Sequence, residues 1–489
     1  MHEEAFNLLA IPPEDWAQTP ESVRLAVQLL LDLVQAQRAE LNELHTRVRD
    51  LEAKLGQTSR TSSKPPSSDP PAAPAKPARV PRGRSAGGQP GHQGHQRPLV
   101  PPEQVDEPID LLPDQCSSCH TPFAAELPTC GEPRRSQVWE LPAIEPHITE
   151  YRQHTRCCPS CQHLVTAPLP STAPPGAFGP RATALVALLR GRYRLSLDDT
   201  AELLEDVWNL SISPASIVTS CERASEALAP VDAAIAEVVQ AAPQVNADET
   251  SWSLHTGKGW LWVAVCTVAT SFRLHSSRGR LALRVLLGEH YRGIVGSDRW
   301  SAYGQFAPWQ RQLCWAHLLR NLLALAERYG AETRWAHQLL ALTDDIFLLW
   351  HLYKEGTLDQ VGLHQALLPL RVQFREQLCA GSSSPHEKIA SFSRDLLKQW
   401  EALWTFSRVE GIEPTNNGAE RALRHAVLWR KGCFGSRSEA GARFVERFLS
   451  VRATCAQQQR SLFGFVTETV EAAWAGRSAP LLVPLPAAA

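Results

Sequence analysis

A heptad pattern near the N-terminus constrains the fold of this chain more than any other feature of the sequence. Between residues 20 and 56, ten positions follow one another in alternating steps of four and three residues. Nine of these ten positions are apolar, namely Val23, Val27, Leu30, Val34, Leu41, Leu44, Val48, Leu51 and Leu55, with Gln37 as the exception. A 3.5-residue repeat keeps one stripe facing a partner helix, whereas an isolated 3.6-residue helix drifts off it. We therefore expect residues 1–56 to form an N-terminal helix and a self-associating coiled coil; the alternative is a helix packed on its own protein.

Size and composition indicate a globular protein of several domains. A chain of 489 residues corresponds to about three domains of ordinary size. No apolar run approaches the ~18 residues of a membrane span, and the acidic N-terminus is unlike an export signal, so we expect no membrane partner. The 49 basic and 51 acidic residues nearly balance, so contact with nucleic acid requires local basic patches. Twelve cysteines without an export signal indicate reduced thiols and a cytoplasmic location.

Residues 57–108 are rich in proline, glycine and serine and carry mostly basic charge. Seven Lys or Arg residues lie between Arg60 and Arg97, against a single acid, Asp69. A segment of this composition buries too little apolar surface to fold alone, which predicts a solvated linker. The alternative is a basic arm that contacts phosphates.

Two CxxC pairs within residues 109–172 predict a zinc ribbon. Four thiolates arranged in two pairs are a ligand set that Zn²⁺ favours in structural sites. The predicted ligands are Cys116, Cys119, Cys158 and Cys161, with Cys130 and Cys157 as competing thiols. The alternating pattern of residues 138–156 predicts a β-hairpin between the pairs. Four buried cysteines or a redox pair are the alternatives.

Residues 176–242 predict a small helical domain. Helices are expected over residues 183–192, 198–207 and 214–228, and Ser213-Pro214 supplies a cap and a first-turn proline for the last one. Two short helices joined by a tight connection are typical of a helix-turn-helix, which often binds DNA. The last helix also carries the acids Glu222 and Glu226, which do not suit contact with DNA. A structural helical domain is therefore an equally good interpretation.

From residue 243 the pattern changes to strands that end in acids. The sequence predicts three strands, a helix and a further strand, which is typical of a mixed sheet covered by helices. We expect Asp248 to end the first strand and Asp298 to end the last one. Glu249 faces the opposite side of its strand by alternation, which makes it a poorer partner for Asp298. Each aspartate alone would also suit a cap or a turn.

A third acid lies in a polar helix predicted within residues 415–436. Asn416, Glu420 and Arg424 recur every four residues and share one helical face. The same segment contains further amide and basic side chains, namely Asn417, Arg421, Arg430 and Lys431. An acid among these groups indicates a place where a metal and a polyanion meet. A solvated helix with a surface ion pair between Glu420 and Arg424 is the alternative.

The order of these motifs resembles the DDE transposases of the insertion-sequence 66 family. The resemblance rests on SSKPPSSD (62–69), GGQPGHQGH (87–95), the paired CxxC, ADET (247–250), SDRWSAY (297–303), CWAHLLRN (314–321), NNGAERALR (416–424) and the basic pair 430–431. It implies an α/β fold with a ribonuclease-H-like catalytic core over residues 243–330 and 413–475. It further implies a helical insertion over residues 331–412, followed by a tail over 476–489.

The resemblance implies that Asp248, Asp298 and Glu420 form the catalytic acid triad. Three carboxylates at one point require cations, and oxygen ligands select Mg²⁺ or Mn²⁺. Asp248 is expected to bridge two ions, with Asp298 on one and Glu420 on the other, for strand cleavage and strand transfer. The implied partners are the DNA of element ends and targets, together with further copies of the chain, at a nucleoid-associated location.

Cys314 and His317 are a mark of the same family. His317 is expected either to position a phosphate or to be an ordinary hydrogen-bonded histidine beside a packed cysteine. Two departures, Leu318-Leu319 after the CWAH motif and an unusual C-terminal region, indicate a divergent subgroup. Two functions of other classes stay open: a non-catalytic zinc-ribbon regulator that binds DNA, and an inactive transposase copy that acts as a coiled-coil scaffold.

Overall fold

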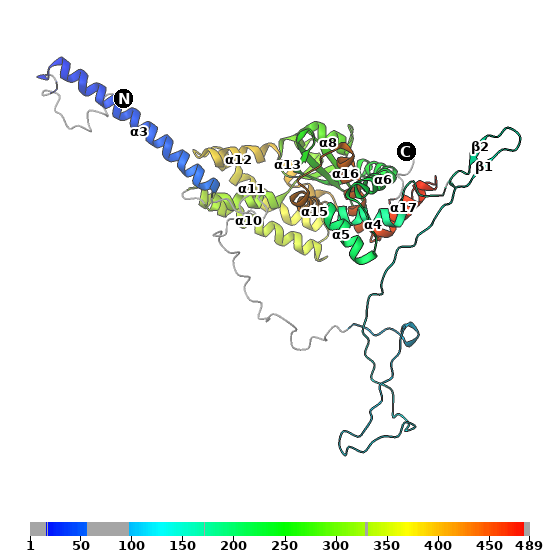
Figure 1. Ribbon diagram of the computed structural model, residues 1–489. Helices are drawn as coiled ribbons and strands as arrows, with labels where there is room; N and C mark the ends of the chain where they lie inside the picture. Colours follow the sequence, from blue (N-terminus) through cyan, green and yellow to red (C-terminus); the bar gives the residue numbers. More distant parts are fainter. Residues whose placement is uncertain (1–15, 17, 56–96, 171, 328–330, 484–489) are drawn as a thin grey trace. The chain divides into compact units, whose positions relative to one another are not determined.

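The computed structural model describes residues 16, 18–55, 97–170, 172–327 and 331–483. The chain divides into two compact units, one comprising residues 1–73, 150–202 and 212–489 and the other residues 74–149 and 203–211. Figure 1 labels helices and strands along the chain. Residues 57–96 of the predicted linker lie outside the described residues. No helix in the described part of the chain is both long enough and apolar enough to cross a membrane.

The heptad segment forms one helix, α3 (Glu21–Leu55), almost as expected. Seam residues such as Val23, Leu30 and Leu41 are exposed in the single chain, at 47%, 59% and 54%. The predicted helix is confirmed. Its pairing with a second copy stays a prediction.

The segment that contains the paired cysteines has little regular structure. Its described elements are the short helix η2 (Pro102–Gln104) and the antiparallel strands β1 (Thr155–Cys157) and β2 (Leu164–Thr166). The hairpin predicted over residues 138–156 is wrong, because the observed hairpin encloses the second CxxC pair instead. Pro142 and Pro146 interrupt the alternating segment, and proline cannot donate a hydrogen bond to a strand ladder.

The three helices predicted after residue 180 are present, together with a fourth. They are α4 (Pro180–Leu188), α5 (Leu197–Trp208) and α6 (Pro214–Ala227), and α7 (Ala229–Ala241) was not predicted. The π-helical turn η3 (Leu189–Tyr193) continues α4. The Ser213 hydroxyl accepts a hydrogen bond from the Ser216 N–H, so the predicted cap at the start of α6 is confirmed.

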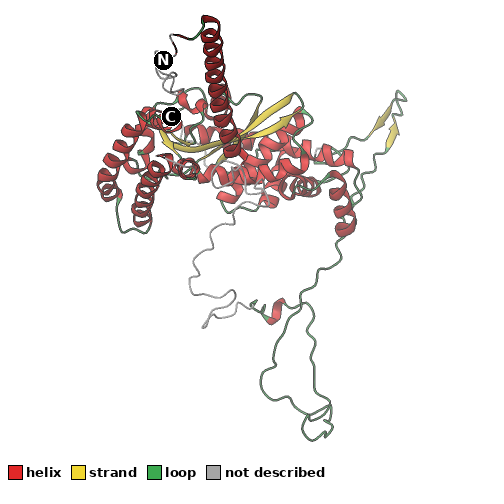
Figure 2. Ribbon diagram, turned by 90° about the vertical axis from the view of Figure 1, so that its left-hand side faces the viewer, coloured by secondary structure: helices red, strands yellow, loops and turns green. Residues whose placement is uncertain are grey.

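A five-stranded mixed sheet forms the centre of the larger unit (Figure 2). The strands are β3 (Gln244–Leu254), β4 (Gly257–Val265), β5 (Thr270–His275), β6 (Ile294–Ser297) and β7 (Arg311–Leu313), in the order β5-β4-β3-β6-β7. β4 runs antiparallel to β3 and β5, whereas β6 runs parallel to β3 and β7. The helix α8 (Arg280–Leu287) and the short turns η4 (Ser301–Gln305) and η5 (Pro308–Gln310) complete the connections.

Helix α16 (Glu439–Gln457) protects the open edge of this sheet at β5. Its side chains Glu446, Ser450 and Thr454 accept hydrogen bonds from the backbone N–H groups of Leu274, Phe272 and Thr270, respectively. Four helical residues rise about 6 Å and two strand residues about 6.6 Å, so the two spacings match along the edge. An edge strand whose donors are satisfied in this way cannot recruit another strand there. The last helix, α17 (Leu462–Trp474), packs against α4.

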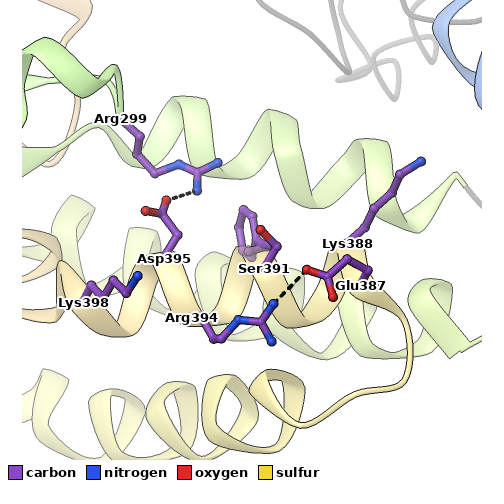
Figure 3. A pocket seen from close by; sticks show the side chains of 8 residues that line it. Arg299, Glu387, Lys388, Ser391, Arg394, Asp395 and Lys398 are labelled. Atoms are coloured by element: carbon purple, nitrogen blue, oxygen red, sulfur yellow. Dashed lines mark hydrogen bonds and ion pairs between the residues drawn. The ribbon is translucent and has the colours of Figure 1, made fainter.

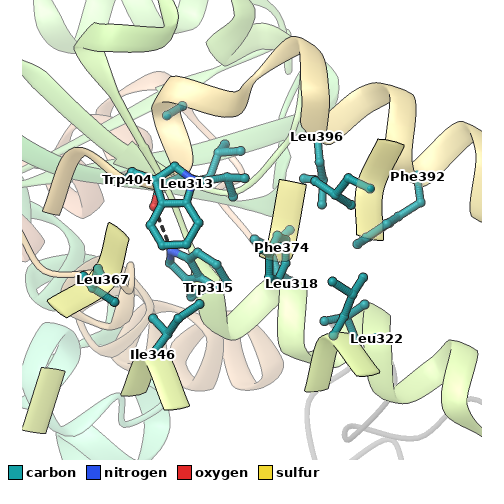
Figure 4. Close-up of a cluster of buried hydrophobic side chains, with 14 of the residues drawn as sticks. Leu313, Trp315, Leu318, Leu322, Ile346, Leu367, Phe374, Phe392, Leu396 and Trp404 are labelled. Atoms are coloured by element: carbon teal, nitrogen blue, oxygen red, sulfur yellow. Dashed lines mark hydrogen bonds between the residues drawn. The ribbon is translucent and has the colours of Figure 1, made fainter. Parts of the chain in front are cut away.

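Helices fill the region between β7 and the C-terminal part of the core, as expected. They are α9 (Trp315–Ala326), α10 (Ala331–Lys354), α11 (Gln360–Ser382), α12 (Glu387–Lys398), α13 (Trp400–Leu403) and α14 (Thr405–Arg408). Their shared core places Trp315, Phe374 and Trp404 in mutual edge contacts (Figure 4). Leu313 of β7 belongs to the same cluster, so the insertion is continuous with the sheet.

Candidate active site

The two predicted aspartates lie at neighbouring strands in the middle of the sheet, one inside its strand and the other directly after it. Asp248 lies inside β3 opposite Val263 of β4, so the expectation that it ends the strand is wrong. The strand continues because the alternation persists and residues as far as Leu254 pair with β4. Asp298 directly follows β6, as predicted. Asn246 pairs with Gly296, so extending that parallel register by two residues brings Asp248 beside Asp298.

The third acid comes to the same strand from the first turn of α15 (Asn417–Cys433). Asn416, the residue before this helix, is fully buried, and its side-chain amide donates to the Ala247 carbonyl oxygen at 2.8 Å. The start of α15 is thereby tied to the residue that precedes Asp248. Glu420 lies one turn further along the helix, with its side chain 31% exposed.

Negative charge is concentrated around Asp248. Burial and the nearby carboxylates of Glu249, Asp298 and Glu420 hold the pKa of Asp248 well above its usual range. The Glu249 N–H donates to Asp248 Oδ1 at 2.9 Å and opposes this shift. A buried carboxyl surrounded by other carboxylates favours either a proton or a cation.

Arg320 of α9 holds the Glu420 carboxylate, and His317 of the same helix lies close to it. Arg320 approaches Glu420 Oε1 at 3.1 Å, and His317 Nδ1 lies 3.5 Å from the same oxygen. Burial and the charge of Arg320 lower the pKa of His317. The predicted alternative, a surface pair between Glu420 and Arg424, is not the one observed, because Glu420 faces α9.

Glu420 also belongs to a compact group of possible metal ligands. Ligand atoms of Cys314, His317 and Glu420 all lie within 4.8 Å of one another, the only such group of three within the described ranges. The three predicted acids do not form a group this tight. Cys314 Sγ accepts a hydrogen bond from the Asn416 N–H at 3.1 Å, and burial raises the pKa of this thiol to about 11. This hydrogen bond is a second link between α9 and the start of α15.

A fourth acid, Glu249, is buried on the other face of β3, as alternation predicts. Its Oε1 accepts from Arg278 at 2.9 Å, and its Oε2 accepts from the Tyr303 hydroxyl at 2.8 Å. Burial and the charge of Asp298 raise the pKa of Glu249. Trp300 connects Arg278 with Asp298. Its indole N–H donates to the Arg278 carbonyl oxygen, and its backbone N–H donates to Asp298 Oδ1 at 2.8 Å. Glu249 is therefore connected to Asp298 through this network, which the prediction of a poor partner overlooked.

Arg311 holds the backbone of the loop that contains Asp298. This residue is 3% exposed, and its guanidinium donates to the Asp298 carbonyl oxygen at 3.0 Å and to Gln399 at 2.7 Å. Burial lowers the pKa of Arg311, and the charge of Asp298 opposes that shift. A buried cation beneath the loop fixes its backbone and leaves the Asp298 carboxylate available.

The remaining predicted contact residues divide into structural and exposed groups. Arg430 donates to Thr250 Oγ1 at 3.0 Å and to Ser251 Oγ at 2.6 Å, so it joins α15 to β3. Arg421, Arg424 and Lys431 are exposed, and Asn417 is half-buried. These exposed cations stay candidates for DNA contact.

The two CxxC pairs form turns of the same geometry. In one, the Cys116 N–H donates to the Thr121 carbonyl and the His120 N–H donates to the Cys116 carbonyl. The other repeats this pattern with Cys158, His163 and Gln162, and the residue after each pair, His120 or Gln162, has a positive φ of 56° or 58°.

Hydrogen bonds also favour the thiolate form of one cysteine in each turn. The Thr121 hydroxyl lies 3.2 Å from Cys119 Sγ and is the main cause that lowers the pKa of Cys119 to about 7. Backbone N–H groups of Cys161 and Ser160 lower the pKa of Cys158. Cys116 and Cys119 belong to the smaller unit and Cys158 and Cys161 to the larger one, so a shared zinc ion stays a prediction.

Sequence reasoning missed Arg320, Arg278, Tyr303 and Arg311. Each acts on a residue at least 13 positions away, and Arg320 is 100 positions from Glu420. Tyr303 and Arg320 do lie in the SDRWSAY and CWAHLLRN motifs, which was the available signal.

Comparison with known proteins gives three matches. Residues 175–444 match the family model described as Transposase IS66 family, which is more than half of the chain. Residues 10–98 match a family of unknown function. The chain is also 24% identical, over 385 residues, to a protein of Sinorhizobium fredii (strain NBRC 101917 / NGR234) named "Uncharacterized protein y4hP". That alignment covers 70% of this chain and 67% of the relative.

Proposed function

Because the chain belongs to the IS66 family of transposases, we propose that Asp248, Asp298 and Glu420 carry out its DNA strand cleavage and strand transfer. On this proposal the mixed sheet and its helices are a ribonuclease-H-like core. The strand order β5-β4-β3-β6-β7, with β4 antiparallel and β6 and β7 parallel to β3, supports this interpretation.

The observation that carries the proposal is the environment of Asp248. Its carboxyl is buried in the central strand, and the charges of Asp298 and Glu420 raise its pKa. Side chains that start 50 and 172 positions away thus act on one carboxyl group. Carboxyl groups with a strongly raised pKa cluster at functional sites, where a cation or a proton offsets the repulsion between like charges.

The donor set fits a hard divalent cation. Asp248, Asp298 and Glu420 offer carboxylate oxygens, which Mg²⁺ and Mn²⁺ prefer. Two such ions, when bound, activate a water or a 3′-hydroxyl and stabilise the leaving oxygen of a phosphodiester. The protein's own part is to hold the three carboxylates: Asn416 fixes the start of α15, and Arg311 fixes the loop of Asp298.

Two accessory proposals concern the N-terminal half. Cys116, Cys119, Cys158 and Cys161 would hold one structural Zn²⁺, which is supported by the matching turns and the lowered pKa values of Cys119 and Cys158. Helix α3 would pair with its counterpart in a second copy, which is supported by its exposed seam of Val and Leu residues.

Cleavage of the element's own end DNA in Mn²⁺ tests the proposed function. The wild-type protein should nick the duplex, whereas Asp248→Asn and Glu420→Gln should reduce nicking below detection and leave DNA binding nearly unchanged. Asp345→Asn, an exposed acid on α10, is the matched control and should nick at the wild-type rate.

Two results would contradict the catalytic assignment. Binding without metal-dependent cleavage by the wild-type protein would favour a DNA-binding regulator. Loss of folding together with binding in Asp248→Asn would assign Asp248 a structural role.

A further inference from the structure

We propose that a basic groove between Arg299 and helix α12 holds the phosphate backbone of the DNA next to the cleaved bond. The groove is a cavity of about 620 Å³. Four cations and two acids line it, namely Arg299, Lys388, Arg394, Lys398, Glu387 and Asp395 (Figure 3). Of the charged residues in this lining, the sequence motifs contain Arg299 alone, because α12 belongs to the helical insertion. The inference rests on the proposed function, since it assigns a place to that function's substrate.

The groove begins beside the candidate active site. Arg299 follows Asp298 in the chain, and its guanidinium donates to Asn321 at 2.9 Å and to Asp395 of α12 at 2.7 Å. Asn321 is the neighbour on α9 of Arg320, which pairs with Glu420 at 3.1 Å. The charges of Arg320 and Arg299 both act on His317, so two cations lie between Glu420 and α12.

One face of α12 continues this series of cations. Lys388, Ser391, Arg394 and Lys398 are exposed and are spaced by three, three and four residues, so they share one side of the helix. Ten residues of helix extend about 15 Å, a length over which a DNA strand presents several phosphates. Figure 3 shows Arg299 across from this side of α12.

The charge balance of the groove favours a polyanion. Its lining has four cations against two acids, and those acids form the pairs Arg299–Asp395 and Arg394–Glu387. The side chains of Arg394 and Glu387 are 49% and 80% exposed, and such surface pairs contribute little stability. A phosphate can replace Glu387 as the partner of Arg394 at small cost. Contacts of this kind position DNA without reading its sequence.

Binding of a fluorescently labelled non-specific duplex to the full-length protein, in a buffer without added Mg²⁺ or Mn²⁺, tests the groove directly. Each lost phosphate contact should reduce the slope of log K against log salt by about 0.9. The variants Arg394→Gln and Lys398→Gln should each show this reduction, and the double variant should lose about 1.8.

Arg443→Gln on α16 is the matched control. Arg443 pairs with Glu439, and the two side chains are 54% and 71% exposed, much like Arg394 and Glu387. This variant should keep the wild-type slope. An equal slope in wild type, Arg394→Gln and Lys398→Gln would overturn the inference.

Photocrosslinking gives a second readout that does not depend on charge. The photoreactive residue p-benzoylphenylalanine in place of Ser391 should crosslink to the duplex, whereas the same residue in place of Glu439 should not. Equal crosslinking at the two positions would overturn the inference. Neither measurement requires cleavage. If both give the contrary result while the wild-type protein still nicks DNA, the groove is rejected and the catalytic proposal stands. If the wild-type protein does not nick DNA but the groove variants still show the reduced salt slope, the proposed catalysis is rejected and the groove stands.

Discussion

The five-stranded sheet with its helices and the CxxC segment achieve order by opposite means. The sheet is held by contacts between residues far apart in the chain, such as Asn416 with Ala247, 169 positions apart, and Ser450 with Phe272, 178 positions apart. The two CxxC turns are held by hydrogen bonds over four or five positions. Apolar side chains between them, such as Val138 and Ile148, are 96% and 86% exposed. Long-range burial therefore stabilises the first region, whereas the second lacks a core and needs another source of stability.

Removal of the proposed zinc ion should have the largest effect, and this effect should be confined to the CxxC segment. Structural zinc contributes roughly 10–16 kcal/mol in small domains that fold around it. The variant Cys158→Ser should lose about one zinc ion per chain, measured by mass spectrometry, together with hydrogen-exchange protection at the amides of Cys158 and Gln162. Protection in β3 and β4 should not change.

The control for this variant is Cys130→Ser, which should retain the metal. Loss of protection in β3 or β4 on zinc removal would mean that the two regions are not independent. An unchanged zinc content in Cys158→Ser would reject the four-cysteine site.

The second-largest effect is expected on the stability of the folded core at acidic pH. His425 of α15 is 9% exposed and bonds through Nε2 to the Gly191 carbonyl oxygen at 2.8 Å, a contact over 234 positions. Burial, together with the charges of Arg452, Arg194 and Arg192, lowers the pKa of His425 to about 4. The unfolded chain takes up this proton near pH 6.5, so it binds more protons between about pH 4 and pH 6.5. Stability should therefore fall as the pH falls through that window, by about 3 kcal/mol from this residue.

Urea unfolding followed by tryptophan fluorescence measures this loss. The variant His425→Gln keeps an N–H donor for Gly191 and should show a pH dependence of stability that is smaller by about 3 kcal/mol between pH 7 and pH 4. An equal pH dependence in both proteins would show that this long-range contact does not depend on a neutral histidine.

The same contrast explains what the sequence predicts and what it leaves out. Short strand-like segments predict β3, β4 and β6, and a serine followed by proline predicts the start of α6, because both signals are local. The position of Asp248 inside β3 depends on its register with β4, and no local pattern contains that register. Arg320 and Glu420 meet only after the insertion folds. The false hairpin over residues 138–156 arose from alternation in a segment that no other element covers.

The smallest of these three effects is expected at Glu249. Its hydrogen-bond network supports the loop of Asp298 from outside the candidate acid triad. Glu249 binds Arg278 and Tyr303, and its hydrogen-bonded connection to Asp298 runs through Arg278 and Trp300. The variant Glu249→Gln puts an amide against the Arg278 guanidinium, which loosens the support of the Asp298 loop. Mn²⁺-dependent nicking should fall about tenfold, equivalent to about 1.4 kcal/mol, with normal DNA binding.

Tyr303→Phe separates the two halves of that network. This variant removes one hydrogen bond to Glu249 and keeps the ion pair with Arg278, so its loss of nicking should be smaller than that of Glu249→Gln. If Glu249→Gln were instead as inactive as Asp248→Asn, Glu249 would belong among the catalytic acids. The face of β3 opposite to Asp248 would then take part in the chemistry, because alternation alone does not separate a supporting acid from a reacting one.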